Sequence, residues 1–450
     1  MQTYLSLSVD FTQTAGSIKP VNAVNNGPIP PTVRGTGNFE DYKALEIPFA
    51  RNHDAAFFAG YDWEYTVDVH RIFPDFDADE NNPAAYRFLS TDRYIQAALD
   101  AGTEPFYRLG CNIEHGAKYG TRPPKDFGKW ARICEHIIRH YNEGWADGFH
   151  HNIRYWEIWN EPCCGNADGS NPCWQGTDEQ FIDFFETAAR HLKAAFPALK
   201  IGGPAFCSLW GERQQRMLAE LGRRRVPLDF VSYHWYGCKP TDIVETFRMA
   251  RELIDRAGYP DAEAILNEWN YIEGWSGEDW RRSLRIEKGQ KGAAFTAACM
   301  TLAQREPVDM FMYYDARPCG MNGIFDTDTY EPLRGYYTFL MFRDVRRLGG
   351  YVPTAPDHEH GIYSCASSDG ERAALMLTHF EQEDDAPERS VRVDCRGSWS
   401  GRRVRVEYRL FDDFNNLTLM RSEVFTATEF SLYVDLPLYA SWLITLTPEE

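Results

Sequence analysis

The sequence lacks any apolar run long enough to cross a membrane, because no window reaches the roughly 18 continuous apolar residues that a spanning helix requires. The N-terminal segment MQTYLSLSVDF also has neither the basic stretch nor the apolar core of a secretory signal. We therefore expect a cytoplasmic protein. Internal repeats, low-complexity runs and long linkers are absent as well, so we expect the modules of the chain to pack together.

The sequence has fewer positively charged than negatively charged residues. The chain has 47 Lys and Arg residues against 66 Asp and Glu residues, which gives a formal net charge of -19 at pH 7. Nucleic acid or an anionic membrane would need a basic face, so the charge argues against both as partners. It also disfavours polyanionic substrates, unless a local basic pocket overrides the total.

Paired cysteine motifs are missing too. The 11 cysteines are odd in number and scattered, which favours reduced thiols over a disulfide framework. Cys163, Cys164 and Cys173 lie close together in the sequence, but without the C-x₂-C spacing of a structural zinc site. We predict no metal and prefer a loop that gates the substrate, with a local disulfide left open.

The first 349 residues alternate between apolar strands and helices with an apolar face. The predicted strands include 45–54, 104–110, 154–159, 199–203, 228–236, 264–269 and 308–314, and the predicted helices include 92–101, 130–141, 181–196, 213–221, 244–257, 292–304 and 334–348. Residues 65–76 are predicted to be a loop or an extended insertion. Strands that alternate with helices indicate parallel βα units, and about eight units predict a closed (β/α)8 TIM barrel, an α/β fold.

The pattern changes near Gly350, where short alternating strands separated by polar turns begin. These strands start at Glu371, Arg389, Arg402 and Phe430 and are typical of an antiparallel β-sandwich. Residues 1–11 also alternate in the manner of a strand. We predict a strand within residues 1–14 that joins the sandwich, a barrel over 15–349 and an accessory sandwich over 350–450.

Two glutamates follow asparagines at the ends of buried strands. Glu161 follows Asn160 in RYWEIWNEP, and Glu268 follows Asn267 in AILNEWN. The carboxyl ends of barrel strands are where such folds place chemistry. Hydrolysis of a glycoside with retention needs one carboxyl group to protonate the leaving oxygen and another to attack the anomeric carbon. We predict Glu161 as the acid/base and Glu268 as the nucleophile, with Asn160 holding a sugar hydroxyl.

WNEP and NEWN, on a barrel followed by a β-sandwich, resemble glycoside hydrolase family 39, which includes β-xylosidases and α-L-iduronidases. The resemblance covers most of the chain, because VNAVNNGP, RNHD, IFPDF, EPFYRLG, PPKD, YWEIWNEP, DFVSYHWYG and ILNEWN follow the order of that family's segments. It implies that the two catalytic glutamates are Glu161 and Glu268. WNEP alone is shared by a wider clan of barrel glycosidases.

Other site residues are predicted from the ends of neighbouring strands. The resemblance implies that His234 and Tyr236 contact the sugar or the nucleophile, with core packing as the alternative. Arg51 could hold the nucleophile ionised or form a structural ion pair, and His53 could bind a sugar hydroxyl. Tyr314 stands where this clan often has a tryptophan, so it either supplies a stacking surface or indicates a different subsite.

Trp269 completes the predicted substrate-binding set. These residues together predict a retaining exo-glycosidase that acts on oligosaccharides by double displacement, with β-xylosidase as the favoured activity. Another glycoside, such as an arabinoside or a uronide, and a non-catalytic carbohydrate-binding protein remain as alternatives. No cofactor is needed, since two carboxylates suffice, and a homo-oligomer is left open.

Overall fold

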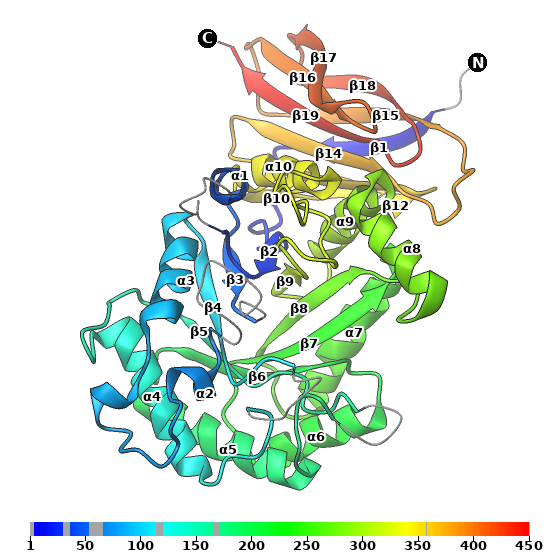
Figure 1. The fold of residues 1–450 in the computed structure, drawn as a ribbon. Helices are drawn as coiled ribbons and strands as arrows, with labels where there is room; N and C mark the ends of the chain where they lie inside the picture. Colours follow the sequence, from blue (N-terminus) through cyan, green and yellow to red (C-terminus); the bar gives the residue numbers. More distant parts are fainter. Residues whose placement is uncertain are drawn as a thin grey trace.

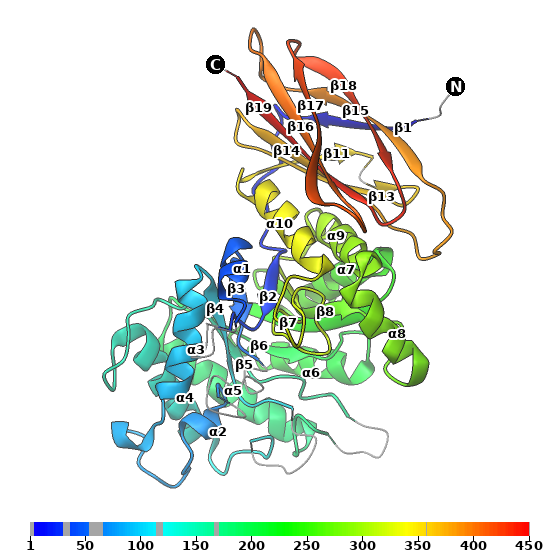
Figure 2. The ribbon, with the colours of Figure 1, turned by 45° about the horizontal axis from the view of Figure 1, so that its top comes forward.

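A computed structural model gives the fold of the chain. It describes residues 4–29, 37–53, 66–113, 120–165, 171–356 and 358–449. Two modules lie one above the other, with the barrel below and the β-sandwich above in both views (Figures 1 and 2). Among the described helices, none combines the length and the apolar character that crossing a membrane demands.

Within these residues, eight parallel strands close a barrel, in the order β2-β3-β4-β5-β6-β7-β8-β9. Their bounds are β2 Ala23–Asn25, β3 Phe49–Arg51, β4 Glu104–Leu109, β5 Tyr155–Ile158, β6 Lys200–Phe206, β7 Phe230–Gly237, β8 Glu263–Tyr271 and β9 Met310–Tyr313. The surrounding helices are α1 Phe39–Ala44, α2 Val69–Ile72, α3 Leu89–Asp100, α4 Phe127–Glu143, α5 Asp178–Ala195, α6 Glu212–Arg223, α7 Pro240–Arg256, α8 Gly277–Lys288, α9 Gln290–Ala303 and α10 Arg334–Arg346. The predicted TIM barrel is therefore confirmed.

The interior of the barrel is layered. Apolar side chains fill one layer, and their rings pack closely, with Phe106 5.3 Å from Tyr155 and 5.2 Å from Phe230 between ring centroids. The members of this layer are Ala23, Phe106, Tyr155, Phe230, Ile265, Met310 and Met312. Nearer the carboxyl ends of the strands, the interior becomes polar. Buried polar side chains cost free energy unless they are paired, so a polar layer indicates a function other than packing.

The C-terminal module consists of two sheets. One has the order β11-β1-β15-β18, and the other has the order β10-β13-β14-β19-β16-β17, with β12 paired to β13. The bounds are β1 Leu5–Asp10, β10 Gly350–Val352, β11 Thr354–Ala355, β12 His358–Glu359, β13 Ile362–Ser368, β14 Ala373–His379, β15 Arg389–Arg396, β16 Val404–Phe411, β17 Asn416–Phe425, β18 Glu429–Leu436 and β19 Ser441–Pro448. The predicted second module of paired sheets is thus confirmed, although β1 pairs with β15 in parallel.

The pairing of β1 with β15 brings the start of the chain into the C-terminal module (Figure 2). We propose the division into residues 1–14, 15–349 and 350–450, of which residues 1–3 and 450 lie outside the described residues. The first and third parts then form one unit, and the barrel is built from the chain between them.

The two modules share a packed interface. Tyr363 and Cys365 of β13 belong to the same apolar cluster as the barrel's helices, whereas Ile362 and Ala366 belong to the core of the sandwich. Helices α9 and α10 lie between the barrel strands and this sheet in both views. Because β13 is covered on both faces, the modules form a continuous apolar interior.

Three helices around the barrel differ from the sequence predictions. The expected loop at residues 65–76 contains the short helix α2, and neither α1 nor α8 was predicted. Only Ser283 and Glu287 of α8 are buried, so this helix lacks the apolar stripe by which helices are recognised in a sequence. Helices α2 and α8 follow the barrel strands β3 and β8 and border the end of the barrel where the polar layer lies.

Candidate active site

The two predicted catalytic glutamates meet at the carboxyl end of the barrel. Glu161 lies three residues after β5, and Glu268 lies within β8. One carboxylate oxygen of each lies within 4.8 Å of the other. The side chain of Glu268 is 7% exposed and that of Glu161 is 12% exposed, so both are largely removed from water.

A bulge in β8 turns Glu268 inward. Simple alternation along a strand would send either Asn267 or Glu268 outward. The pairing with β7 skips Asn267, because Leu266 and Glu268 pair with consecutive residues of β7. An unpaired residue of this kind bends a strand and redirects its side chains. Both Asn267 and Glu268 consequently face the interior, where Asn267 Nδ2 donates to Glu157 Oε1 at 2.6 Å.

The backbone that carries Glu161 is strained. Trp159 and Glu161 have φ angles of 76° and 45°, in the left-handed region that residues with a side chain rarely occupy. Each such residue costs about 1–3 kcal/mol and persists only where the surroundings hold it. Here the indole nitrogen of Trp159 donates to the carbonyl of Cys173 at 2.9 Å, and the amide of Glu161 donates to the carbonyl of Ala205 at 3.0 Å.

Arg51 connects most of the polar layer. Its Nη1 donates to Glu268 Oε1 at 2.7 Å and to Asn25 Oδ1 at 3.1 Å. Its Nε donates to Glu157 Oε2 and its Nη2 donates to Asn160 Oδ1, both at 2.6 Å. Burial alone lowers the pKa of the guanidinium, but the charges of Glu157 and Glu268 outweigh that effect and hold the pKa above its ordinary value. Arg51 thus favours the ionised form of Glu268.

Glu157 is the member of this network that the sequence analysis missed. It is fully buried in β5, and besides Arg51 it accepts hydrogen bonds from Ser232 Oγ at 2.5 Å and from Asn267 Nδ2 at 2.6 Å. A charged residue between two tryptophans of a buried strand is the signal that could have revealed it, because charges are almost never fully buried unless they are paired.

His234 lies between the two glutamates. Its Nδ1 is 2.7 Å from Glu161 Oε1 and 3.4 Å from Glu268 Oε2. Burial lowers the pKa of His234, although the charge of Glu268 opposes this effect, so the imidazole is neutral near pH 7. Tyr236 donates its hydroxyl to Glu268 Oε2 at 2.8 Å, and burial followed by the charge of Glu268 raises its pKa well above the ordinary value.

His53 borders the same carboxylate. Its Nε2 is 3.8 Å from Glu268 Oε1, and burial together with the charge of Arg51 lowers its pKa well below the ordinary value. Its backbone carbonyl accepts a hydrogen bond from Arg108 Nη2 at 2.9 Å. The structure therefore brings together seven of the predicted residues, which are Arg51, His53, Asn160, Glu161, His234, Tyr236 and Glu268.

Comparisons with known proteins bear on this geometry. The family model for glycosyl hydrolases family 39 matches residues 62–259. Over these residues, which are less than half of the chain, the sequence is similar to that family. The β-xylosidase of Geobacillus stearothermophilus is 28% identical over 229 residues, which are 44% of this chain and 44% of that protein. The match thus spans less than half the length of this relative.

Solved structures are similar to the chain over its whole length. A glucosidase from Croceicoccus marinus has a TM-score of 0.82 at 21% identity, with 100% of both chains covered. The GH39 enzyme from Xanthomonas axonopodis pv. citri has a TM-score of 0.73 at 17% identity, with 100% of this chain and 98% of that chain covered. At such identities the two structures show a common fold.

Two predicted residues, Trp269 and Tyr314, lie differently from the other seven. Trp269 is fully buried on the outer side of the barrel, where its ring stacks on Phe311 with 4.0 Å between centroids. It faces away from Glu268 because the strand alternates again after the bulge, so we leave it out of the proposed site. The ring of Tyr314 lies at the edge of the site, 6.4 Å from that of Tyr236 and nearly perpendicular to it.

Another aromatic side chain borders the site without having been predicted. Trp275 is 60% exposed and packs edge-on against Tyr236, with 5.0 Å between ring centroids. Its other neighbour is Trp280 of α8, whose ring is stacked at 5.6 Å. An exposed tryptophan next to a residue that binds Glu268 offers a flat surface for a sugar ring.

Cysteines gather beside Glu161. The Sγ of Cys173 is 3.9 Å from Glu161 Oε2, and the Sγ atoms of Cys163 and Cys207 are 3.5 Å apart. Hydrogen bonds from the thiols of Cys163 and Cys164 lower the pKa of Cys207 far below its ordinary value. All 11 cysteines are free thiols in the described residues. Residues 166–170 of the predicted gating loop lie outside them.

Glu161, His234 and Glu268 also have the spacing of a metal site, since one ligand atom of each lies within 4.8 Å of the others. Arg51 already occupies one oxygen of Glu268 at 2.7 Å. A cation would have to share that carboxylate with the guanidinium, so the electrostatics favour the pair of carboxylates without a metal. The absence of a metal stays a prediction.

Proposed function

We propose that this protein is a retaining glycoside hydrolase that uses Glu268 as the nucleophile and Glu161 as the acid/base. The observation that carries the proposal is the close approach of the two carboxylates, whose oxygens lie within 4.8 Å. Retaining enzymes hold their carboxyl groups about 5–5.5 Å apart, whereas inverting enzymes leave about 6.5–9.5 Å for a water molecule.

The surroundings of the two carboxylates support different roles. Glu268 accepts hydrogen bonds from Arg51 and Tyr236, which favour the charged form that a nucleophile needs. Glu161 has the neutral His234 at 2.7 Å. A neutral imidazole can accept a hydrogen bond from a protonated carboxyl group or donate one to an ionised carboxylate, depending on its tautomer. This contact therefore suits a group that changes its protonation state during the reaction.

The proposed reaction has two steps. In the first, a carboxylate oxygen of Glu268 bonds to the anomeric carbon while the bond to the leaving oxygen breaks, and Glu161 transfers its proton to that oxygen. In the second, a water molecule gives its proton to Glu161 and attacks the anomeric carbon, and the bond to Glu268 breaks. The sugar leaves with its anomeric configuration retained and both glutamates return to their initial states.

Asn160 supports the binding of a sugar hydroxyl beside the reacting carbon. Its Oδ1 accepts a hydrogen bond from Arg51, which fixes the orientation of the amide. Its Nδ2 is buried and has no hydrogen-bond partner among the described residues. A buried donor of this kind costs free energy until it is satisfied, so a hydroxyl oxygen placed there would be bound favourably.

We further propose a terminal β-xyloside as the substrate and oligosaccharides as the natural ligands, with exo-action. This choice rests on the β-xylosidase of Geobacillus stearothermophilus, which is 28% identical to this chain over 229 residues. The structural likeness to a glucosidase, at 21% identity, reflects the fold alone.

The test is hydrolysis of a panel of nitrophenyl glycosides by the native protein, Glu268→Ala and Glu161→Ala. We expect cleavage of the β-xyloside, a loss of at least about 10⁴-fold in kcat with Glu268→Ala, and rescue of Glu161→Ala by azide when the leaving group is good. Proton NMR of the first-formed sugar should show the β-anomer.

Glu263→Gln is a matched control, because Glu263 lies at the opposite end of the same strand and pairs with Lys200 at the surface. It should behave like the native protein. Full activity of Glu268→Ala would refute the assignment of the nucleophile. Cleavage of another glycoside would keep the mechanism and exclude the xylosidase activity, and tight sugar binding without turnover would indicate a carbohydrate-binding protein.

A further inference from the structure

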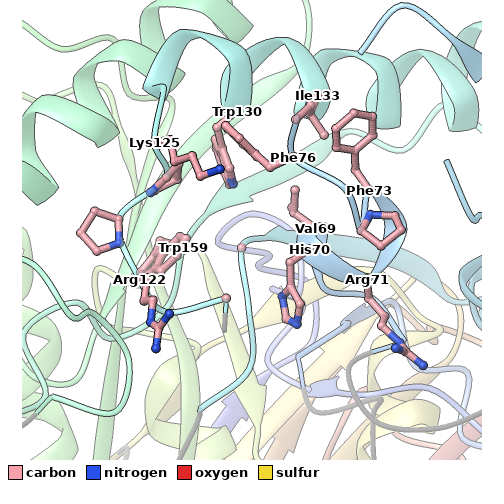
Figure 3. Close-up of a pocket in the computed structure, with 15 residues that line it drawn as sticks. Val69, His70, Arg71, Phe73, Phe76, Arg122, Lys125, Trp130, Ile133 and Trp159 are labelled. Carbon is pink, nitrogen blue, oxygen red and sulfur yellow. The ribbon is translucent and has the colours of Figure 1, made fainter. Parts of the chain in front are cut away.

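A cavity with a volume of about 960 Å³ is lined by α2, by the segment before α4 and by Trp159, which follows β5. Figure 3 shows its walls: Val69, His70 and Arg71 on one side, and Arg122, Lys125 and Trp159 on the other. The first three residues belong to α2, and Arg122 and Lys125 precede α4. The cavity is large enough for one or two sugar rings, since ligand pockets typically measure about 300–1,000 Å³.

The charge of this cavity is opposite to that of the whole protein. Four basic side chains, His70, Arg71, Arg122 and Lys125, line it, and no Asp or Glu is present among its described lining residues. The chain as a whole carries a formal charge of -19. A concave surface lined by one sign of charge concentrates the field and attracts ligands of the opposite sign.

These cations are available to a ligand. Arg71 and Arg122 are exposed, and neither has an ion-pair partner in the described part of the chain. Lys125 lies 2.9 Å from Asp77, but the two side chains are 72% and 75% exposed. Ion pairs at such exposure are worth about 0–1 kcal/mol, so a better-placed anion can replace Asp77.

Aromatic residues complete the cavity. Trp130 and Trp159 are 5% and 1% exposed and form an apolar wall, and Phe76 is half-buried at the rim. Binding sites for small molecules combine predominantly apolar walls with a few placed polar groups. The half-buried ring of Phe76 can contact the face of a sugar ring, and a guanidinium group suits an oxyanion, which it binds in a fork geometry.

The walls of the cavity are linked to the proposed active site through the chain and through hydrogen bonds. Trp159 lies two residues before Glu161 in the chain. Asp68, immediately before α2, accepts a hydrogen bond from Arg108 Nη2 at 2.7 Å, and the same nitrogen donates to the carbonyl of His53 at 2.9 Å. The cavity therefore lies on the side of the barrel that carries Glu161, where the leaving group must be protonated.

We infer that this cavity is a subsite for an oxyanion on the leaving-group part of the substrate, the carboxylate of a uronic acid or a sulfate ester. Arg71 and Arg122 lie on opposite sides of the cavity (Figure 3), so the anion is attracted from both sides and pairs with one of the two guanidinium groups. The inference rests on the proposed function and adds to it a preference for an anionic substituent one or two sugars beyond the scissile bond.

The experiment compares kcat/KM for two oligosaccharides that differ only in a uronic acid on the leaving-group part, and for a third with a sulfate ester there. The enzymes are the native protein, the double variant Arg71→Gln/Arg122→Gln, and Arg93→Gln. Arg93 is an exposed arginine of α3 that does not line the cavity, so it controls for the loss of surface charge.

We expect the native protein to prefer an anionic substrate about tenfold or more, and the double variant to lose that preference. The preference should fall as NaCl is raised from 0.05 to 0.5 M, because salt screens charges that are open to solvent. Arg93→Gln should keep it. The anionic substrate that is cleaved with the higher kcat/KM identifies the oxyanion. Equal cleavage of all three substrates by the native protein overturns the inference.

Cleavage of the neutral substrate reports on the proposed function separately. If the neutral compound is cleaved and the anionic compounds gain nothing, the subsite is refuted while the glycosidase activity stands. If no compound is cleaved, calorimetric titration of the native protein and the double variant with the uronic acid oligosaccharide decides on the cavity alone. Binding that the double variant loses supports the subsite, and binding that it retains refutes it.

Discussion

Replacing Arg51 by methionine removes the positive charge that two buried carboxylates share. Glu157 and Glu268 each accept a hydrogen bond from the guanidinium, at 2.6 Å and 2.7 Å. Removing one partner of a buried ion pair typically costs 3–5 kcal/mol. Glu157 keeps its bonds from Ser232 and Asn267, so we expect a loss near the lower end, about 3 kcal/mol in the free energy of unfolding.

The same substitution acts on the proposed nucleophile. Without the guanidinium, the protonated and neutral form of Glu268 is favoured, so a higher pH is needed to ionise it. The acidic limb of the pH profile of kcat/KM should move upward by roughly 1–3 pH units. At neutral pH we expect kcat/KM to fall about a hundredfold, which corresponds to about 2.7 kcal/mol of lost transition-state stabilisation.

Urea unfolding followed by tryptophan fluorescence measures the first effect, and the pH profile with a nitrophenyl xyloside measures the second. Arg154→Met is the control, since Arg154 is 59% exposed immediately before β5 and pairs with Glu104. It should lose less than about 1 kcal/mol. A loss below about 1 kcal/mol in Arg51→Met, together with an unmoved acidic limb, would refute the role given to Arg51.

Three further predictions concern groups around the same site. Burial lowers the pKa of His53 and His234, so the unfolded chain binds more protons than the folded chain below about pH 6.5, and the free energy of unfolding falls as the pH drops. His53→Asn or His234→Asn should make this pH dependence less steep, by up to about 1.4 kcal/mol per pH unit. Urea titrations between pH 7 and 5 measure it. An unchanged slope would contradict the buried neutral state. Oxidation by diamide should link Cys163 to Cys207, whose sulfurs must approach from 3.5 Å to about 2.05 Å, and should lower kcat/KM by up to about 100-fold. Dithiothreitol should restore the activity, and diamide should not affect Cys207→Ser. Full activity of a protein in which mass spectrometry shows the disulfide would contradict this prediction. Trp275→Ala should raise KM for xylo-oligosaccharides about two- to tenfold in steady-state assays, because an exposed stacking surface is lost, and an unaltered KM would show that no sugar lies there.

The fold could be predicted from the sequence wherever burial leaves a simple pattern. Barrel strands such as β5 read as apolar runs because both faces are covered, and helices such as α4 show one apolar face. The strand β13 was missed because small residues and double coverage remove its alternation. The parallel pairing of β1 with β15 could not be foreseen, since nothing local in the sequence links strands so far apart.

The sequence predicts the charged residues of the candidate site, but it predicts less well in which direction the neighbouring side chains point. Glu161 and Glu268 follow strand ends, which the sequence makes visible, and the structure brings them together. The bulge that turns Glu268 inward depends on register with β7, so the outward direction of Trp269 could not be read from alternation alone. Cys207 lies far from Cys163 in the chain, and only the barrel places the two side by side.

The position of β1 has a consequence for synthesis of the chain. β1 ends at Asp10, but its parallel partner β15 begins at Arg389. At a synthesis rate of about 5–20 residues per second, roughly 20–80 s pass between the synthesis of β1 and that of β15. The barrel can fold in that interval, whereas the sheet that contains β1 cannot. The N-terminal strand is therefore exposed during translation, and a C-terminal truncation would leave its edge open to pairing with other chains.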